Sequence, residues 1–278
     1  MSQEHPLFTA YPPGMDVHIS IGTVPTPYLT YDGYGLLIGG TADLDGVRRL
    51  LEGENVHPMA TAAGRAIMGI WVVNFTDANL GPHHELQFSF LVAHEPIPLV
   101  EDHPLALTKA LFVNPKARMF CYGLWNSTEK VVAYNREVLG LNARLSQGTI
   151  SNSGQQVTFS LANDAGDTLF EGQVSRAKRT PLAVGWSLMR LLGLRETVRA
   201  LSEPYLSAKV VNPIGDVFPY NGDAQTYLAA DTPVTQFYDA QTDSIRFGMV
   251  DAAALNFDPQ FLEHFQPFRF VYLQPERP

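Results

Sequence analysis

The segment GPHHELQFSFLV, residues 81–92, places side chains that can transfer protons inside an otherwise apolar stretch. If the segment is a β-strand, His83, Glu85, Gln87 and Ser89 share one face, and the other face is mostly apolar. A carboxyl group enclosed on the polar face of a closed sheet has a raised pKa and can act as a general acid or base. On an open sheet the same row faces water, and this alternative stays open at the level of the sequence.

A second segment, AYNREVLGLNARLS, residues 133–146, begins polar, continues as a short apolar run and carries one glycine before its last basic residue, Arg144. A guanidinium stays protonated in proteins, so it binds anions and is not a nucleophile. The segment therefore offers an anion-binding group at Arg144, with a surface salt bridge as the alternative.

Other common chemistries find little support in the sequence. No Gly-rich phosphate loop, Gly-x-Ser-x-Gly elbow or His-Glu-x-x-His motif is present, which argues against the usual nucleotide, hydrolase and zincin sites. His83 and Glu85 share a strand face and could ligate a metal only with a third ligand from elsewhere, such as His18, His57 or His94. We therefore expect neither a metal nor a cofactor.

The elements that must position these residues are mostly strands. Runs rich in β-branched and aromatic residues, separated by turn-formers, predict strands at residues 35–40, 66–75, 86–93, 117–124, 148–161, 168–177, 207–211 and 268–273. Helices are predicted at 41–58, with Asp43 or Thr41 as its cap, and at 184–206. On the second helix Trp186, Met189, Leu192 and Leu201 contribute to a broad apolar stripe. The second helix either closes one end of the sheet or forms a lid or subunit contact.

Composition limits the organisation of the chain and its partners. A length of 278 residues, with 45% hydrophobic and 17% charged residues and no repeat, predicts one domain over residues 1–278, with 1–27 as an irregular lead-in. A net charge of −9 with no run of Lys or Arg argues against nucleic acid and anionic membranes. No signal peptide or long apolar run is found, so we expect a cytoplasmic protein. The single cysteine, Cys121, excludes an intramolecular disulfide.

Three motifs in this order resemble the acetoacetate decarboxylase family: GPHHE at residues 81–85, NREVLGLNARL at 135–145 and FLEHFQPFRFVYL at 261–273. The resemblance covers roughly residue 28 to the C-terminus. It implies an α+β fold that is mainly antiparallel β, a cone-like β-barrel with a few helices and a small central pocket. It also implies a homo-oligomer.

The chain departs from that family at its nucleophile. The family motif reads Gly-Arg-Glu-x-x-Gly-x-Pro-Lys-Lys, and its first lysine forms a Schiff base with the β-keto acid. Matching the motif places Asn142 at the proline, Ala143 at the Schiff-base lysine and Arg144 at the neighbouring cation. Alanine cannot form an imine, so the sequence indicates a divergent member without that lysine. Rescue would need another lysine, and the candidates are Lys109, Lys116, Lys130, Lys178 and Lys209.

The function expected from these residues is acid–base chemistry without an imine. Glu85 would move a proton while Arg144 holds an oxyanion. The substrate would be an oxo acid or another enolizable carbonyl compound, and the enzyme a lyase, dehydratase, isomerase or cyclase of specialised metabolism. The alternative is a non-catalytic protein that binds a small hydrophobic acid. The residues expected to contact the substrate are His83, Gln87, Trp71, Tyr122, Trp125 and Asn142.

Overall fold

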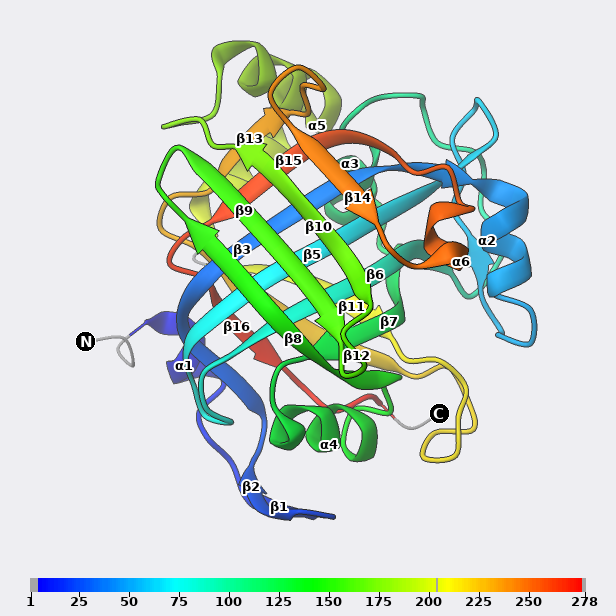
Figure 1. The fold of residues 1–278 in the computed structure, drawn as a ribbon. Helices are drawn as coiled ribbons and strands as arrows, with labels where there is room; N and C mark the ends of the chain where they lie inside the picture. The colour runs from blue at the N-terminus through cyan, green and yellow to red at the C-terminus, as the bar shows by residue number, and fades with distance from the viewer. Residues whose placement is uncertain (1–4, 204, 277–278) are drawn as a thin grey trace.

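Strands form most of the molecule (Figure 1), which is a computed structural model that describes residues 5–203 and 205–276, except the side chains at 200–202 and 250–251. The strands are β1 (Asp16–Ile19), β2 (Gly22–Pro25), β3 (Tyr28–Asp43), β4 (His57–Pro58), β5 (Arg65–Ala78), β6 (His83–Ala93), β7 (Arg118–Asn126), β8 (Ala143–Asn152), β9 (Gln156–Asn163), β10 (Thr168–Ser175), β11 (Leu206–Val211), β12 (Asp223–Ala229), β13 (Val234–Phe237), β14 (Ser244–Phe247), β15 (Asp258–Phe265) and β16 (Arg269–Tyr272). The helices are α1 (Pro6–Ala10), α2 (Leu44–Leu50), α3 (Ala106–Val113), α4 (Glu129–Glu137), α5 (Leu182–Ser202) and α6 (Val250–Ala253). The fold is α+β and mainly antiparallel β, as the sequence predicts.

Seven strands close into a barrel. Around the ring they are β7, β11, β12, β16, β3, β5 and β6, and β6 pairs with β7 to complete the circle. All of these pairs are antiparallel except β7 with β11. Closure gives every strand an inner and an outer face, so the polar row of β6 has an enclosed side on which to lie. The sequence left open whether that sheet is closed, and the structure settles it.

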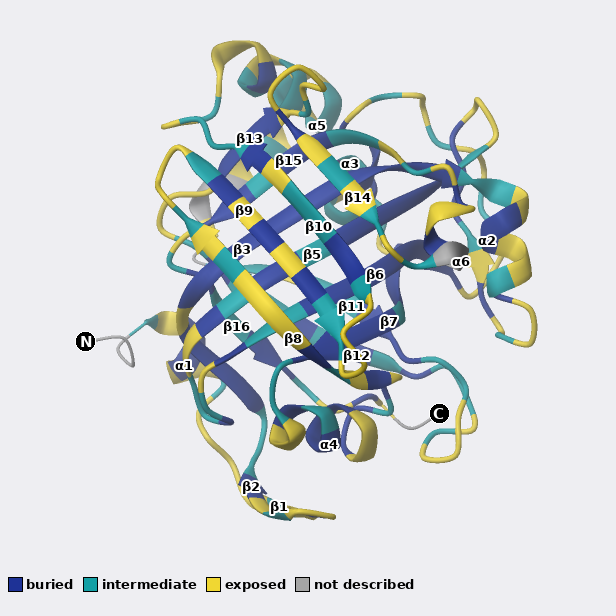
Figure 2. Ribbon diagram, viewed as in Figure 1, coloured by how far each residue is buried: buried dark blue, intermediate teal, exposed yellow. Residues whose placement is uncertain are grey.

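A second layer of strands covers part of the outer face of the barrel. In Figure 1, β8, β9, β10 and β14 cross in front of β3, β5 and β6. β8 joins this layer to the barrel because it pairs in parallel with β7. Between the two layers lies an apolar core that includes Leu36, Phe88 and Phe170. Figure 2 shows the buried strands behind this layer, the alternation of buried and exposed residues along β9, and the largely exposed outer strand β8.

Three predicted elements have different boundaries in the structure. The single strand expected at residues 148–161 is a hairpin, β8 and β9, because Ser153 and Gly154 form a turn. The helix expected at 41–58 is α2, which ends at Leu50; of its two candidate caps, Asp43 accepts a bond of 2.6 Å from the backbone NH of Gly46. The lead-in expected to be irregular contains α1 and the hairpin of β1 and β2.

Helix α5 corresponds to the predicted helix at 184–206 but is kinked at Gly193. Val184 is buried and Leu188 and Leu191 pack against the core inside the barrel, whereas Trp186, expected on the apolar stripe, is 62% exposed. The stripe was also expected to include Leu201, which lies outside the described side chains. None of the described helices has the length and apolar character needed to cross a membrane.

The segment 133–146 folds as the end of α4, a turn and the start of β8. The turn passes through Gly140, whose φ of 68° lies in the left-handed region. The backbone NH of Leu141 then donates to the carbonyl of Asn135 at 2.8 Å, which holds the turn against the helix. A side chain at Gly140 would place its Cβ 2.2 Å from Cδ2 of Phe218. The backbone conformation and the close approach of Phe218 therefore explain why this position of the motif is a glycine.

We expect Gly140→Ala to lower the free energy of unfolding by about 1–3 kcal/mol. Alanine is strained in the left-handed backbone conformation, and its Cβ would displace the ring of Phe218. Gly53→Ala is the matched control, since Gly53 also has a positive φ, of 91°, but nothing lies within 4 Å of its Cβ position. Urea denaturation of both variants separates the strain of the left-handed backbone, which both variants have, from the clash with Phe218, which only Gly140→Ala has. Equal losses in the two variants would mean that the contact with Phe218 contributes nothing.

Candidate functional site

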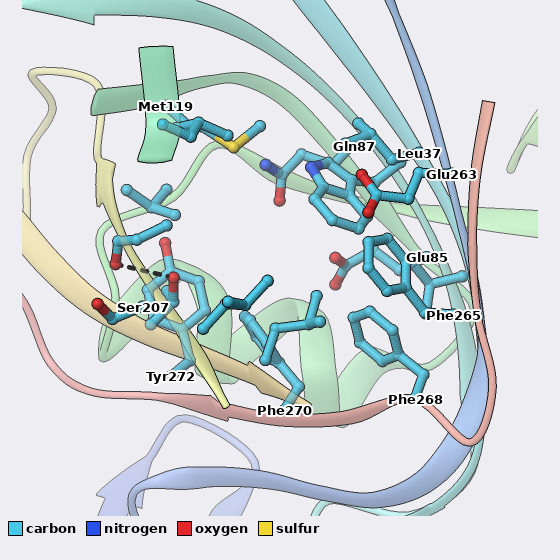
Figure 3. A pocket seen from close by; sticks show the side chains of 18 of the residues that line it. Leu37, Glu85, Gln87, Met119, Ser207, Glu263, Phe265, Phe268, Phe270 and Tyr272 are labelled. Carbon is cyan, nitrogen blue, oxygen red and sulfur yellow. Dashed lines mark hydrogen bonds between the residues drawn. The ribbon is translucent and has the colours of Figure 1, made fainter. Parts of the chain in front are cut away.

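A cavity of about 150 Å³ lies inside the barrel (Figure 3). Strands β3, β5, β6, β7, β11, β12, β15 and β16 provide most of its wall, and α3, α4 and α5 contribute further residues. Most of the lining is apolar, as with Leu37, Val73 and Met119. The inner faces of the barrel strands therefore leave a space of the kind that binds small molecules.

Five aromatic side chains form one continuous wall of this cavity, and we call this set the aromatic wall. Neighbouring rings in the set contact each other with centroid separations between 5.7 and 5.9 Å, alternating between stacked and edge-on arrangements. Their order along the wall is Trp71, Phe265, Phe268, Phe270 and Tyr272. Four of the five come from β15, β16 and the turn between them, so the C-terminal strands supply most of this surface.

Glu85 points into the cavity from β6 (Figure 3). Its Oε2 accepts a hydrogen bond of 2.8 Å from Nδ2 of Asn126, whose Oδ1 in turn accepts one of 2.9 Å from Asn135. Burial raises the pKa of Glu85 to about 7, against a smaller lowering by the bond from Asn126. The two asparagines fix the position of a carboxyl group that both accepts and releases protons near neutral pH.

A second carboxyl group, that of Glu263, points into the same cavity from β15. Burial raises its pKa to about 7 as well, and a hydrogen bond with Thr235 lowers it slightly. Glu263 was not predicted from the sequence. The available signal was its alternation with Phe261 and Phe265, which puts an acid on the same strand face as two aromatic residues.

His83 does not line the cavity but supports Tyr28, which does. Nε2 of His83 lies 2.5 Å from the hydroxyl of Tyr28, and Nδ1 lies 2.8 Å from the carbonyl of Gly81. Because a carbonyl only accepts, Nδ1 carries the proton and the Tyr28 hydroxyl donates to Nε2. Burial lowers the pKa of His83 to about 4, so the ring is neutral at physiological pH. With both nitrogens engaged, His83 is not available as the metal ligand considered from the sequence. Within the described residues, His, Cys, Asp and Glu form no group of three that could hold a metal ion.

Trp71 and Gln87, two of the predicted contact residues, line the cavity. Tyr122 and Trp125 lie on the other face of β7, in the core between the two layers. The register of β6 and β7 shifts between Phe88 and Ser89, so simple alternation along each strand does not reveal which side chains of the two strands meet.

The expected pairing of Arg144 with Glu85 is not formed. Arg144 and Asn142 are exposed and do not line the cavity, whereas Ala143 between them is fully buried. The guanidinium of Arg144 lies 5.9 Å from the ring centroid of Trp125. The physical reason is that β8 leaves the barrel for the outer layer immediately after this motif, and it takes Arg144 with it.

The cation that does line the cavity is Arg199 of α5. Its Nη2 donates to the carbonyl of Phe112 in α3 at 2.9 Å, and its Nη1 lies 2.8 Å from a carboxylate oxygen of Glu196. The side chain is 47% exposed, which places it at the entrance and not in the interior. Lysines are absent from the described lining, and the candidates Lys109, Lys116 and Lys209 form ion pairs with other residues instead.

No protein-family model matches the chain, and no curated protein matches it. Solved structures do share its fold. Acetoacetate decarboxylase from Legionella pneumophila has a TM-score of 0.59 and 12% identity, with 90% of this chain and 86% of that chain covered. A second acetoacetate decarboxylase structure has a TM-score of 0.55 and 10% identity over 89% and 87% of the two chains. The enduracididine biosynthesis enzyme MppR, in complex with pyruvate, has a TM-score of 0.54 and 12% identity over 93% and 95%. The chain therefore has an acetoacetate decarboxylase-like fold.

Proposed function

We propose that the cavity is the active site of an enzyme that transfers protons to and from a small oxo acid or another enolizable carbonyl compound. The observation that carries the proposal is the pair of carboxyl groups, Glu85 and Glu263, inside an aromatic cavity with pKa values of about 7. Carboxyl groups tuned in this way can serve as base and acid at neutral pH. The shared fold with acetoacetate decarboxylase and with an enzyme that binds pyruvate agrees with this class of substrate.

In the proposed reaction Glu85 takes the proton from the carbon next to the carbonyl group and later returns it. Asn126 and Asn135 hold the Glu85 carboxyl in place for that step. The hydroxyl of Tyr272, which lines the same cavity, donates to the enolate oxygen as negative charge develops there. Arg199, and not Arg144, is the cation able to receive a substrate carboxylate at the entrance. Such a step can begin an isomerisation, a dehydration, an aldol-type cleavage or a cyclisation.

We further propose that the reaction proceeds without an imine, because no lysine lines the cavity in the described part of the chain and the motif match places Ala143 where the family has its lysine. Incubation with acetoacetate or pyruvate and borohydride is expected to leave the protein mass unchanged. A covalent adduct on any lysine would contradict this part of the proposal.

Proton exchange tests the proposal without knowledge of the product. The protein is incubated in D₂O with a panel of small 2-oxo and 3-oxo acids and ketones, and loss of the proton next to the carbonyl is followed by NMR. We expect faster exchange than in buffer alone for at least one compound. Absence of exchange for every compound that binds would reject the enzyme and favour the second candidate.

That second candidate is a non-catalytic protein that binds a small hydrophobic acid. The predominantly apolar lining of the cavity, with Arg199 at its entrance, is the observation in its favour. It predicts saturable binding without proton exchange, and binding that does not change when Glu85 is replaced by glutamine.

A further inference from the structure

We propose that the cavity binds a small organic cation, an ammonium group on an apolar body, with Glu263 as its anionic partner and the aromatic wall as its apolar surface. This inference deepens the proposed function, because it names a charged group that the ligand of the same cavity carries. It concerns equilibrium binding, so it can fail or succeed separately from catalysis.

The cavity contains hydrogen-bond acceptors that a donor-rich ligand could satisfy: the carboxylate oxygens of Glu85 and Glu263 and Oδ1 of Asn135. In the described part of the chain, Oδ1 of Asn135, which only accepts, is buried in the lining without a hydrogen-bond partner; the buried hydroxyls of Thr108 and Tyr272 in the same lining also lack partners and can either donate or accept. Nε2 of Gln87 already donates to Oγ of Ser89 at 2.6 Å, and Nδ2 of Asn126 to Glu85. Buried acceptors without partners are costly. An ammonium group carries three donors and no acceptor, so it can satisfy these acceptors.

The charges in the cavity also favour a cation. Glu85 and Glu263 form no ion pair within the described residues, although both carboxyl groups enter the same small space. The one cationic residue of the described lining, Arg199, already contacts Glu196 and the carbonyl of Phe112. An anion placed deep in the cavity would face two carboxyl groups with no neighbouring cation. A cation there supplies the missing partner of a buried charge.

The aromatic wall also attracts a cation. A cation within about 6 Å of an aromatic ring centroid is attracted by the negative ring face, and the attraction increases when water is excluded. Glu263 stands beside this wall, since it pairs with Leu37, which pairs with Trp71, and it precedes Phe265 by two residues. Figure 3 shows the Glu263 carboxyl, Phe265 and Phe268 on the same side of the cavity. One group can therefore contact both the carboxylate and an aromatic ring.

The volume of the cavity limits the size of the apolar part of the ligand. A cavity of about 150 Å³ is of the size that holds a molecule as large as benzene. Benzylammonium joins one aromatic ring to an ammonium group through a single carbon, and it is therefore a suitable probe. Benzyl alcohol has a similar shape without charge, and benzoate carries the opposite charge.

Binding of a cation should depend on pH because it requires an ionised carboxylate. The titratable groups around Glu263 in the cavity are Glu85, Tyr28, Tyr272, Glu203 and Arg199. Burial raises the pKa values of Tyr28 and Tyr272, and it raises the pKa values of Glu85 and Glu263 to about 7, so these two carboxyl groups change charge between pH 6 and pH 8. A carboxyl group with a pKa of about 7 is mostly protonated at pH 6 and mostly ionised at pH 8. Affinity should fall about tenfold from pH 8 to pH 6, with release of a proton on binding.

The test is isothermal titration of the full chain with the three probes at pH 6 and pH 8. We expect benzylammonium to bind at least about tenfold more tightly than benzyl alcohol at pH 8, and benzoate to bind more weakly than either. Glu263→Gln should weaken benzylammonium about tenfold or more and leave benzyl alcohol within about twofold. Glu52→Gln, at an exposed glutamate that does not line the cavity, is the matched control and should change neither.

Three outcomes overturn the inference: no binding of benzylammonium, binding no tighter than that of benzyl alcohol, or affinity insensitive to both Glu263→Gln and pH. An unchanged near-UV circular dichroism spectrum of Glu263→Gln shows that a loss of binding does not come from a collapsed cavity. Binding of benzylammonium without proton exchange on any carbonyl compound would refute the proposed function and leave this inference standing. Proton exchange on a carbonyl compound without binding of benzylammonium would refute this inference and leave the proposed function standing.

Discussion

Glu85→Gln is expected to lower the rate of proton exchange by about 100- to 10,000-fold, the range that a positioned general base contributes. Glutamine keeps the shape of the side chain and can still accept the hydrogen bond from Asn126, but it cannot take up a proton at neutral pH. The loss should appear in kcat and not in KM, because the carboxyl group acts on the reacting carbon and does not anchor the substrate. The measurement is the NMR exchange rate at saturating substrate.

The pH profile supplies a second readout for this variant. In the wild type the exchange rate should rise through pH 7 as Glu85 ionises, since burial raises its pKa to about 7. The residual rate of Glu85→Gln should lack this rise, and Glu52→Gln should keep both the rate and the profile of the wild type. A Glu85→Gln variant with an unchanged rate would assign the base to another residue, with Glu263 the next to test.

The second large effect concerns stability. Glu263→Gln is expected to raise the free energy of unfolding at pH 8 by about 3 kcal/mol. The usual pKa of 4.5 rises to about 7 in the folded protein, a difference of about 2.5, and each pKa unit corresponds to 1.36 kcal/mol. Because the folded state holds this proton more tightly than the unfolded state, stability is lost as pH rises from 4.5 through 7. Glutamine has no charge to bury and avoids that loss.

The effect of Glu263→Gln must be measured as the difference in free energy of unfolding between the variant and the wild type at each pH. Burial lowers the pKa values of His83 and His264 to about 4, so these groups make the fold less stable as pH falls below 6.5, which is the opposite of the effect of Glu85 and Glu263. Urea denaturation of both proteins from pH 4 to pH 8 cancels the histidine contribution. The difference should grow from near zero at pH 4 to its full value at pH 8. A difference independent of pH would show that the Glu263 carboxyl is not held neutral by burial.

Strand alternation predicted one side of the site for a simple physical reason, whereas the barrel was expected only from the family resemblance. Side chains alternate along a strand, so Glu85 and Gln87 had to share a face, and only closure of the sheet was needed to enclose them. Trp71 follows the same rule on the neighbouring strand. These residues belong to long, regular strands, where pattern and structure agree.

The rest of the site could not be predicted, because the positions of its residues depend on contacts between segments that are far apart in the sequence. Arg144 belongs to a strand that leaves the barrel, and no local pattern distinguishes such a strand from one that stays. Glu263 faces the cavity because β15 pairs with β3, more than two hundred residues earlier in the chain. Arg199 reaches the entrance because α5 packs beside α3. Contacts of this kind are properties of the topology and not of any short stretch of sequence.

The closure of the barrel by β16 has a consequence for the order of folding. Strands β3, β5 and β6 can pair as soon as they are synthesised, but the edge of β3 that receives β15 and β16 stays open until the end of the described chain is available. Phe268, Phe270 and Tyr272 lie on or next to β16, so a chain without β16 lacks three of the five side chains of the aromatic wall. Until then the edge of β3 is unpaired, and an unpaired strand edge is a place where another chain can add a strand.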